Sequence, residues 1–321
     1  MSDTGCTIDV LFPDLLSRPA PRLTFLERLL ARSDRCSASA AHEALLFSLF
    51  GHPTDEALPV AAVVLYGAHE DSDAAGGVWL CADPVQFIPA RDHVLVSPTR
   101  ALSATEATTL AAELASHFQA DGWQVRHAAG HLFLRGPQAP DFSLPPTREV
   151  LGRSLDSVLP HDREHLHWLS LINELQMLLH GSALNRQREA AGAPPINGLW
   201  LWGAGVLPTA GPAPFDTVWG GGALVRGLAR LGACAMRDLP MDAGALADAS
   251  GTRHLVVFPE HHDLTPAVDA AWFGPLLSAL RARRFQRLSV HDGQGRVFHL
   301  TPRGLRRFWR LCRPIESYRT C

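Results

Sequence analysis

Short apolar runs of strand length alternate with longer segments of helical spacing along most of the 321 residues of this chain. The runs that predict strands are residues 8–12, 60–66, 78–87, 94–96, 199–202, 254–258 and 287–291. The segments that predict helices are residues 23–31, 38–50, 163–180, 222–231, 267–282 and 302–311. Because strands that alternate with helices usually lie parallel in one sheet, we expect an α/β fold with a mainly parallel sheet.

A small α+β block interrupts this alternation between residues 83 and 136. Residues 103–106 have the form of a helix capping box, and residues 123–135 alternate like a hairpin. A proline-rich stretch, residues 136–146, follows the block. We therefore predict a core formed by residues 1–82 and 145–321, with a small α+β cap domain and its exit linker inserted at residues 83–144.

The composition limits the class of protein. Hydrophobic residues make up 46% of the chain and charged residues 19%, which favours a sizeable core and excludes global disorder. No uncharged apolar run approaches the roughly 20 residues that cross a bilayer, and the first residues lack the pattern of a signal peptide. The six cysteines are dispersed without a Cys-x-x-Cys spacing. We expect a cytoplasmic protein without membrane association.

Positive charge concentrates at the C-terminal end of the chain. From residue 281 onward the sequence has 11 arginines and two acidic residues, Asp292 and Glu316. Such a basic segment can meet nucleic acid, an acidic partner or a phosphorylated ligand. A solvated helix face is the alternative, and both interpretations stay open.

Residues 195–205 form the most distinctive stretch of the sequence, because two tryptophans at alternate positions are followed by glycines. In α/β proteins ligands gather at the carboxyl ends of strands, where glycine lets the backbone approach a ligand closely. The candidate ligand-binding residues are Asn197, Trp202, Gly203 and Gly205. A packing corner between two backbone segments is the alternative.

The helix predicted before this stretch has a polar face. Asn173 and His180 share that face, and Arg188 follows the helix. Since arginine suits phosphate and carboxylate groups, these residues are candidates for holding an anionic ligand. A polar interface with the cap domain is the alternative.

The order of these features resembles that of a known enzyme family. Residues 197–205 and the helix at 222–231 are similar to a stretch of the archaeal-type cofactor-independent phosphoglycerate mutases, which belong to the alkaline phosphatase superfamily. Residues 46–53 resemble the segment after the nucleophile of that family, and residues 83–87 and 130–134 resemble parts of its inserted domain. The resemblance implies an alkaline-phosphatase-like α/β core with an inserted cap.

The resemblance also implies two divalent cations, Mn²⁺, Mg²⁺ or Zn²⁺, which activate a phosphoryl-accepting serine. The first metal ligand of the family is an acid in an Asp-Gly pair after the first strand, and Asp14 matches the acid without the glycine. The later candidate ligands follow two further strands and are Glu260, His261, His262, Asp263, His291, Asp292 and His299. Their spacing departs from the family pattern, so polar loops on a scaffold that has lost its metals are the alternative.

The position of the nucleophile departs further from the family. Counted back from Gly51, the Ser-Asp pair of the family aligns with His42 and Glu43, which are therefore the catalytic candidates. A histidine cannot form the same phosphoserine, although Ser37 and Ser39 lie nearby in the sequence.

These observations predict a phosphoglycerate mutase-like protein with a degenerate phosphotransfer site. Such a protein would bind a phosphorylated or carboxylated metabolite, or a protein partner. The alternative is an active metal-dependent mutase or a related phosphotransferase or phosphohydrolase, which requires bound metals and an intact nucleophile.

Overall fold

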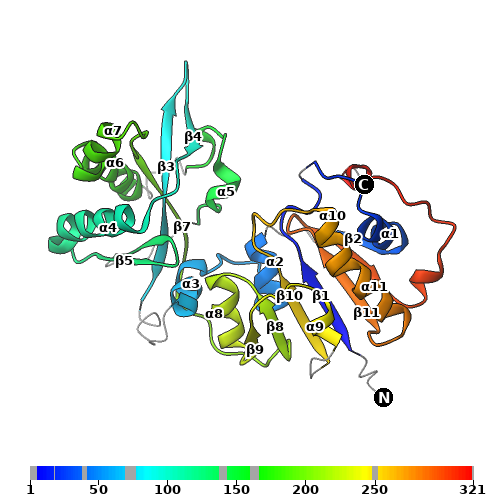
Figure 1. Ribbon diagram of the computed structural model, residues 1–321. Coiled ribbons are helices and arrows are strands. Elements are labelled where there is room, and N and C mark those ends of the chain that lie inside the picture. The colour runs from blue at the N-terminus through cyan, green and yellow to red at the C-terminus, as the bar shows by residue number, and fades with distance from the viewer. Residues whose placement is uncertain are drawn as a thin grey trace. The chain divides into compact units, whose positions relative to one another are not determined.

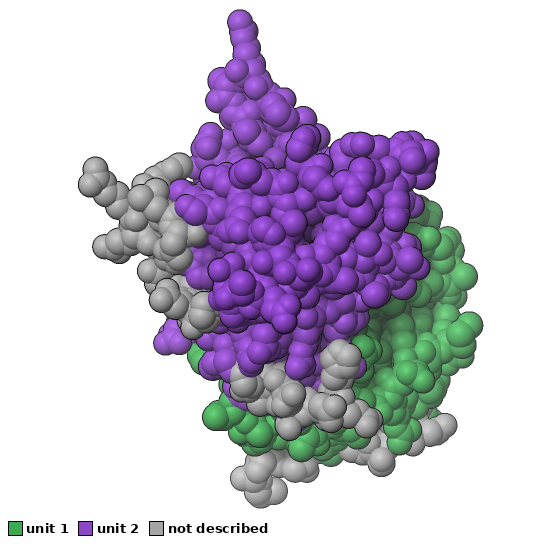
Figure 2. All heavy atoms as spheres, turned by 90° about the vertical axis from the view of Figure 1, so that its left-hand side faces the viewer, with its two compact units in different colours: residues 1–54, 209–321 green, residues 55–208 purple. Residues whose placement is uncertain are grey.

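The computed structural model describes residues 6–17, 19–37, 42–68, 77–136, 143–159, 166–247 and 252–319. The chain divides into two compact units, coloured separately in Figure 2. Unit 1 contains residues 1–54 and 209–321, and unit 2 contains residues 55–208. Each unit has its own sheet and its own hydrophobic core.

A seven-stranded sheet forms the centre of unit 1. Its strands are β1 (Thr7–Leu11), β2 (Asp34–Ser37), β8 (Thr217–Gly220), β9 (Ala235–Arg237), β10 (Arg253–Val257), β11 (Arg287–His291) and β12 (Arg296–Leu300). They lie in the order β2-β12-β11-β1-β10-β8-β9. The five strands β11, β1, β10, β8 and β9 are parallel to one another, whereas β12 pairs antiparallel with both β11 and β2. The prediction of an α/β fold with a mainly parallel sheet is confirmed.

Helices accompany this sheet in the sequence and cover it (Figure 1). They are α1 (Thr24–Arg32), α2 (His42–Leu49), α8 (Ala223–Leu231), α9 (Gly244–Ala247), α10 (Pro266–Val268) and α11 (Gly274–Arg281). The apolar side chains of α1 and α11 share one core with Ile8, Val10 and Val290 of the sheet. Because successive strand residues point to opposite faces, Asp9 and Ser289 lie on the other face of the sheet.

Unit 2 is built on a five-stranded antiparallel sheet. Its strands are β3 (Trp79–Pro89), β4 (Val94–Pro98), β5 (Gln124–Ala128), β6 (His131–Arg135) and β7 (Gly198–Gly205). Its helices are α3 (Val60–Ala68), α4 (Ala104–Phe118), α5 (Thr147–Val150), α6 (Leu166–His180) and α7 (Ala183–Ala190). Figure 1 shows α4, α6 and α7 together on one side of the sheet, where their leucines form one core with residues of β3, β6 and β7.

The capping box and the hairpin of unit 2 form as the sequence predicts. The Ser103 hydroxyl accepts a hydrogen bond from the Glu106 backbone N–H at 3.2 Å, and the Glu106 carboxylate accepts one from the Ser103 N–H at 2.8 Å. Strands β5 and β6 pair antiparallel across the turn at Ala129 and Gly130, both of which have positive φ angles. Local sequence signals are sufficient for both elements because their partners lie within a few residues.

Two predicted elements are wrong. Residues 60–66 belong to helix α3 and do not form a strand. This run is apolar and buried on every side, so it has no period that separates a helix from a strand. Residues 302–311 do not form a helix, since only Gly304–Arg306 makes one 3₁₀ turn. The arginines of that segment bind the end of α1 and the start of β2, which replaces helical packing by side-chain contacts.

Strand β7 differs from its prediction in the sheet that it joins. The sequence places residues 199–202 in the parallel sheet, but β7 pairs antiparallel with β3 in unit 2. Unit 2 is accordingly larger than the insertion expected at residues 83–144, because it also contains α3, α6, α7 and β7. In the part of the chain that the structure describes, no helix is long and apolar enough to span a membrane.

Candidate functional site

The carboxyl ends of β1, β10 and β11 meet at one edge of the unit 1 sheet, because these strands are parallel neighbours. Backbone hydrogen bonds tie the loops that follow them. The Phe12 N–H donates to the His291 carbonyl at 3.0 Å, the Asp14 N–H donates to the Asp292 carbonyl at 3.0 Å, and the Phe258 N–H donates to the Leu11 carbonyl at 3.0 Å. We call this edge, formed by residues 12–14, 258–263 and 291–293 with the start of α2, the β-edge site.

His42 and Glu43 begin helix α2 and are both buried. The Nε2 atom of His42 lies 4.0 Å from a carboxylate oxygen of Glu260, which follows β10. A Cβ atom at Gly293 would lie 3.3 Å from His42 Nδ1 and 3.3 Å from the Pro13 Cα. The fold therefore brings the predicted catalytic histidine to the loops after β1, β10 and β11, as a site at this edge requires.

Asp14 lies at this edge in an uncommon backbone conformation, with a φ of 58°. Aspartate is one of the few residues besides glycine that adopt this left-handed region readily. Its carboxylate accepts a hydrogen bond from the Gln294 side-chain amide at 2.9 Å. The loss of the family glycine after Asp14 is compatible with the turn because Asp14 itself carries the positive φ.

The Asp292 carboxylate is consumed by its own turn. One oxygen accepts hydrogen bonds from the backbone N–H groups of Gln294 and Arg296 at 2.8 and 2.9 Å, and the other lies 3.1 Å from the Arg296 guanidinium. The side chain is 1% exposed. Asp292 therefore anchors the β11–β12 turn and has little capacity left to ligate a cation.

His291 and His299 bind side chains on one face of the sheet. His291 Nε2 lies 3.0 Å from an Asp9 carboxylate oxygen, and His299 Nδ1 lies 3.0 Å from the Ser289 hydroxyl. Burial raises the pKa of Asp9, but the hydrogen bond and positive charge of His291 outweigh it and hold that pKa below its usual value. Burial, with the positive charges of Arg287 and His291, lowers the pKa of His299. Both histidines are thus part of a polar row within the sheet.

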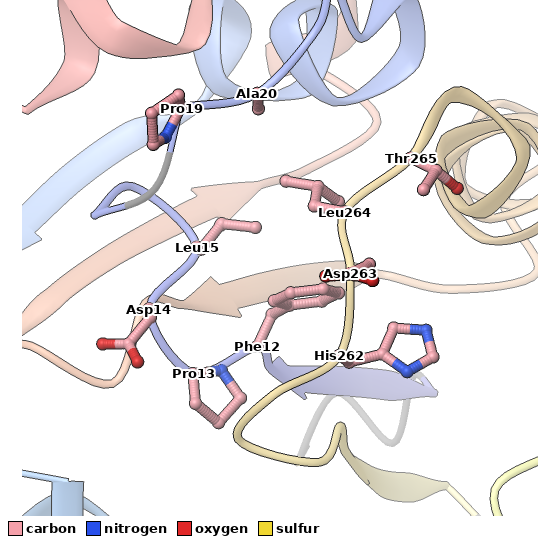
Figure 3. A pocket seen from close by; sticks show the side chains of 10 residues that line it. All are labelled: Phe12, Pro13, Asp14, Leu15, Pro19, Ala20, His262, Asp263, Leu264 and Thr265. Atoms are coloured by element: carbon pink, nitrogen blue, oxygen red, sulfur yellow. The ribbon is translucent and has the colours of Figure 1, made fainter.

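The loop after β10 carries the remaining candidate ligands, Glu260, His261, His262 and Asp263. His262 and Asp263 line a cavity of about 240 Å³ together with Phe12 and Asp14. Figure 3 shows the Asp14 carboxylate and the His262 ring on opposite sides of this cavity, pointing away from each other. The two side chains do not converge on one point.

The donor set does not fit the two-cation site that the family resemblance implies. Among the described residues, no group of three or more His, Cys, Asp or Glu side chains is arranged to hold a metal ion. The serines near the nucleophile position do not restore the chemistry. Ser37 is exposed at the end of β2, which is the edge strand of the sheet, and Ser39 lies outside the described residues.

The ligand site expected in unit 2 is not assembled. The leucines at 199 and 201 of β7 pack in the core with α6, so the alternating Trp202 lies on the opposite face of the sheet. Its indole N–H donates to the Asp83 carboxylate at 2.7 Å. Asn173 and His180 are exposed on α6. The structure therefore separates Trp202 from the polar helix face by the thickness of the sheet.

The Arg188 side chain is buried and paired within unit 2, so it is not exposed for binding a ligand. Its side chain is 1% exposed, and its guanidinium donates to the Glu106 carboxylate at 2.8 Å and to the Pro194 carbonyl at 2.9 Å. Backbone hydrogen bonds from Ser103 lead the causes that hold the pKa of Glu106 below its usual value, and the Arg188 charge adds to them. This ion pair joins α7 to the start of α4.

Asn197, Gly203 and Gly205 follow the packing alternative. The Asn197 side chain accepts from the Phe87 N–H at 2.7 Å and donates to the Phe87 carbonyl at 2.9 Å, which extends the β3–β7 pairing. A Cβ at Gly205 would lie 2.9 Å from the Cα of Pro59, and one at Gly203 would lie 3.0 Å from the Cβ of Val60. These glycines let β7 approach the start of α3 closely.

Sequence reasoning missed two acids that lie within strands, the buried Asp9 and the half-buried Asp83. Asp83 accepts hydrogen bonds from Trp202 and Thr147 and lies 3.3 Å from His131. Burial raises its pKa, but the contacts with His131, Thr147 and Trp202 outweigh burial and hold the pKa below its usual value. A single acid inside an apolar strand is the signal that marks both residues, because such an acid needs buried partners.

Comparisons with known proteins give a limited sequence match. No family model matches the chain. A stretch of 145 residues is 26% identical to the 2,3-bisphosphoglycerate-independent phosphoglycerate mutase of Methanosarcina mazei. The match covers 42% of this chain and 36% of that protein, so the chain matches about a third of the length of this relative.

Two solved structures are similar over most of the chain. The cofactor-independent phosphoglycerate mutase of Thermoplasma acidophilum has a TM-score of 0.42 and 18% identity, over 92% of this chain and 90% of that one. The PH0037 protein of Pyrococcus horikoshii has a TM-score of 0.49 and 13% identity, over 92% of this chain and 87% of that one. The sequence match shows that the matched part of the chain is similar to the cofactor-independent phosphoglycerate mutase of Methanosarcina mazei.

Proposed function

We propose that this protein is a phosphoglycerate mutase-like protein that binds a phosphorylated or carboxylated metabolite at the β-edge site without mutase turnover. The observation that carries the proposal is the state of Asp292. Both of its carboxylate oxygens are bound within its own turn, where the family resemblance expects an acid that ligates a cation. Without converging carboxylates, two divalent cations lack the oxygen ligands that they need.

The position expected for the nucleophile supports the same proposal. His42 stands there, buried and 4.0 Å from Glu260. A histidine lacks the hydroxyl that would become a phosphoserine, so the family reaction has no matching acceptor at this position. The cavity of about 240 Å³ that Asp14 and His262 of the β-edge site line has room for a small metabolite.

Charge at the β-edge site makes a binding test specific. Glu260 is exposed beside His42, and its carboxylate repels an anion, whereas a protonated His42 attracts one. Glu260→Gln should therefore strengthen the binding of an anionic ligand several-fold, and His42→Gln should weaken it. Phosphoglycerate, which carries both a phosphate and a carboxylate, is the probe, and titration calorimetry is the measurement.

Assays of turnover and metal content test the proposed absence of mutase activity. The full chain, purified and dialysed with Mn²⁺, should contain less than stoichiometric metal by elemental analysis and should not interconvert 2- and 3-phosphoglycerate. Intact mass spectrometry after incubation with phosphoglycerate should show no added phosphoryl group. Stoichiometric metal together with metal-dependent turnover would show that the protein is an active mutase. If neither the wild type nor any variant binds phosphoglycerate, the proposed metabolite binding is wrong, whereas the proposed absence of turnover is unaffected.

A further inference from the structure

The loop formed by residues 303–313 exposes three large apolar side chains close together. Phe308 is 79% exposed, Trp309 is 65% exposed and Leu311 is 80% exposed. The rings of Phe308 and Trp309 contact each other edge to face, with centroids 5.4 Å apart. Other large exposed apolar residues of the described chain, such as Met177 and Met241, are isolated in the sequence. A cluster of this kind on a surface usually marks an interaction site.

The 303–313 loop is fixed to the body of unit 1 by its inward-facing groups. The Arg307 guanidinium binds the Asp34 carboxylate and the Arg32 carbonyl, and Arg310 donates to the Ser33 carbonyl at 2.7 Å. Arg32 donates in turn to the Leu305 carbonyl at 2.8 Å. Because these contacts hold the backbone, the exposure of the apolar side chains is a feature of the folded loop.

The remaining charge of the 303–313 loop has one sign. The loop contains five arginines and no acidic residue. Arg303, Arg306 and Arg313 are exposed and form no ion pair with the described residues. Three arginines thus flank three apolar side chains. This combination suits a surface that has an anionic outer layer over an apolar interior.

We infer that the 303–313 loop binds the surface of an anionic lipid bilayer. Tryptophan and phenylalanine favour the boundary between headgroups and acyl chains, leucine favours the acyl region, and each arginine near the surface is attracted by anionic headgroups. A specific protein partner would need roughly 800 Å² on each side, contributed by 20–30 residues, whereas one 11-residue loop suffices for a lipid surface. This inference replaces the expectation of no membrane association with attachment to one membrane surface.

Vesicle co-sedimentation of the full chain tests the inference. The protein should sediment with vesicles of phosphatidylcholine that contain 30% phosphatidylglycerol, and it should stay in the supernatant with vesicles of phosphatidylcholine alone. Raising the salt concentration should release it, because salt screens the arginines. The triple variant Phe308→Ser, Trp309→Ser, Leu311→Ser should lose binding. The matched control, Ile88→Ser, Met177→Ser, Met241→Ser, removes isolated exposed apolar side chains and should bind like the wild type.

A second set of variants tests the charge. Replacing Arg303, Arg306 and Arg313 by glutamine should weaken binding by about fivefold per arginine, or about 100-fold in total, at low ionic strength. Replacing the exposed Arg91, Arg281 and Arg284 is the control and should have a much smaller effect. Trp309 emission should shift to shorter wavelength on vesicles, and Trp309→Phe should remove that shift.

Several outcomes would overturn the inference. One is absence of sedimentation with anionic vesicles, and another is equal binding to neutral and anionic vesicles. A third is binding of an acidic peptide or a single-stranded oligonucleotide that shields Trp309 while vesicles do not. Circular dichroism of each variant shows whether it is folded. If the Phe308→Ser, Trp309→Ser, Leu311→Ser variant is folded and still binds vesicles, the 303–313 loop is not the binding surface. The 303–313 loop carries no residue of the β-edge site, so either proposal can fail alone.

Discussion

Whether a polar side chain of this protein can bind a ligand or serves packing depends on the groups that it contacts. Arg188 is a sequence-based candidate for holding an anion, yet its guanidinium lies against Glu106 and the Pro194 carbonyl and is 1% exposed. A buried charge of this kind is stable only while it is paired and hydrogen-bonded. The residue therefore contributes to the stability of unit 2.

The first prediction concerns this ion pair. Arg188→Ala should lower the free energy of unfolding by about 2–4 kcal/mol, because it removes a buried ion pair and leaves the Pro194 carbonyl without its donor. Arg186→Ala is the matched control on the same helix, where the side chain is exposed, and it should cost less than about 1 kcal/mol. Urea unfolding measures both. An Arg188→Ala variant that unfolds like the wild type but loses phosphoglycerate binding would restore the ligand role.

At the scale of the elements, β7 shows how glycine permits close packing. Gly203 has a φ of 64° and lies against the start of α3, and Gly205 lies against Pro59. Asn197, just before β7, binds Phe87, and these glycines end the strand, so β7 is fitted to its neighbours at both ends. The glycines thus serve the contact between β7 and α3 within unit 2.

The second prediction tests that contact. A Cβ at Gly205 would lie 2.9 Å from the Pro59 backbone, so Gly205→Ala should force β7 and α3 apart and cost about 1–3 kcal/mol. Gly211→Ala is the control, since a Cβ there meets no atom within 4 Å and the φ angle is not positive. Thermal unfolding followed by circular dichroism compares the two variants. Equal melting temperatures would show that β7 and the start of α3 move apart without a loss of stability.

At the scale of the whole molecule, the chain forms two units with separate cores. Most of the unit 2 core comes from outside the insertion expected at residues 83–144, because α6, α7 and β7 supply many of its large side chains. The chain thus enters unit 2 near residue 55 and leaves it near residue 208.

The third prediction follows from these boundaries. Residues 55–208 produced alone should give a folded protein with cooperative unfolding, since the fragment retains its sheet and its core. Residues 83–144 produced alone should stay unfolded, because they lack β7 and the leucines of α6. Circular dichroism and amide exchange distinguish the two fragments. A folded 83–144 fragment would support the smaller boundary.

The sequence by itself determined the elements whose signals are local. Strand β1, helices α1, α4 and α8, the capping box at Ser103 and the β5–β6 hairpin all form where the pattern predicts them. Their capping and turn contacts lie within a few residues, and their apolar faces follow a clear period. The motifs that resemble those of the phosphoglycerate mutases are likewise short stretches of sequence.

Only the tertiary structure decided which sheet β7 joins, that residues 60–66 form a helix, and which candidate ligands converge. Strand β7 pairs with a strand more than 100 residues earlier, and His291 and Arg188 are bound to Asp9 and Glu106, which lie far from them in the sequence. A sequence gives the type of each polar group but not its neighbours. Whether a carboxylate or an imidazole can bind a ligand depends on how many of its hydrogen-bonding positions those neighbours have already filled.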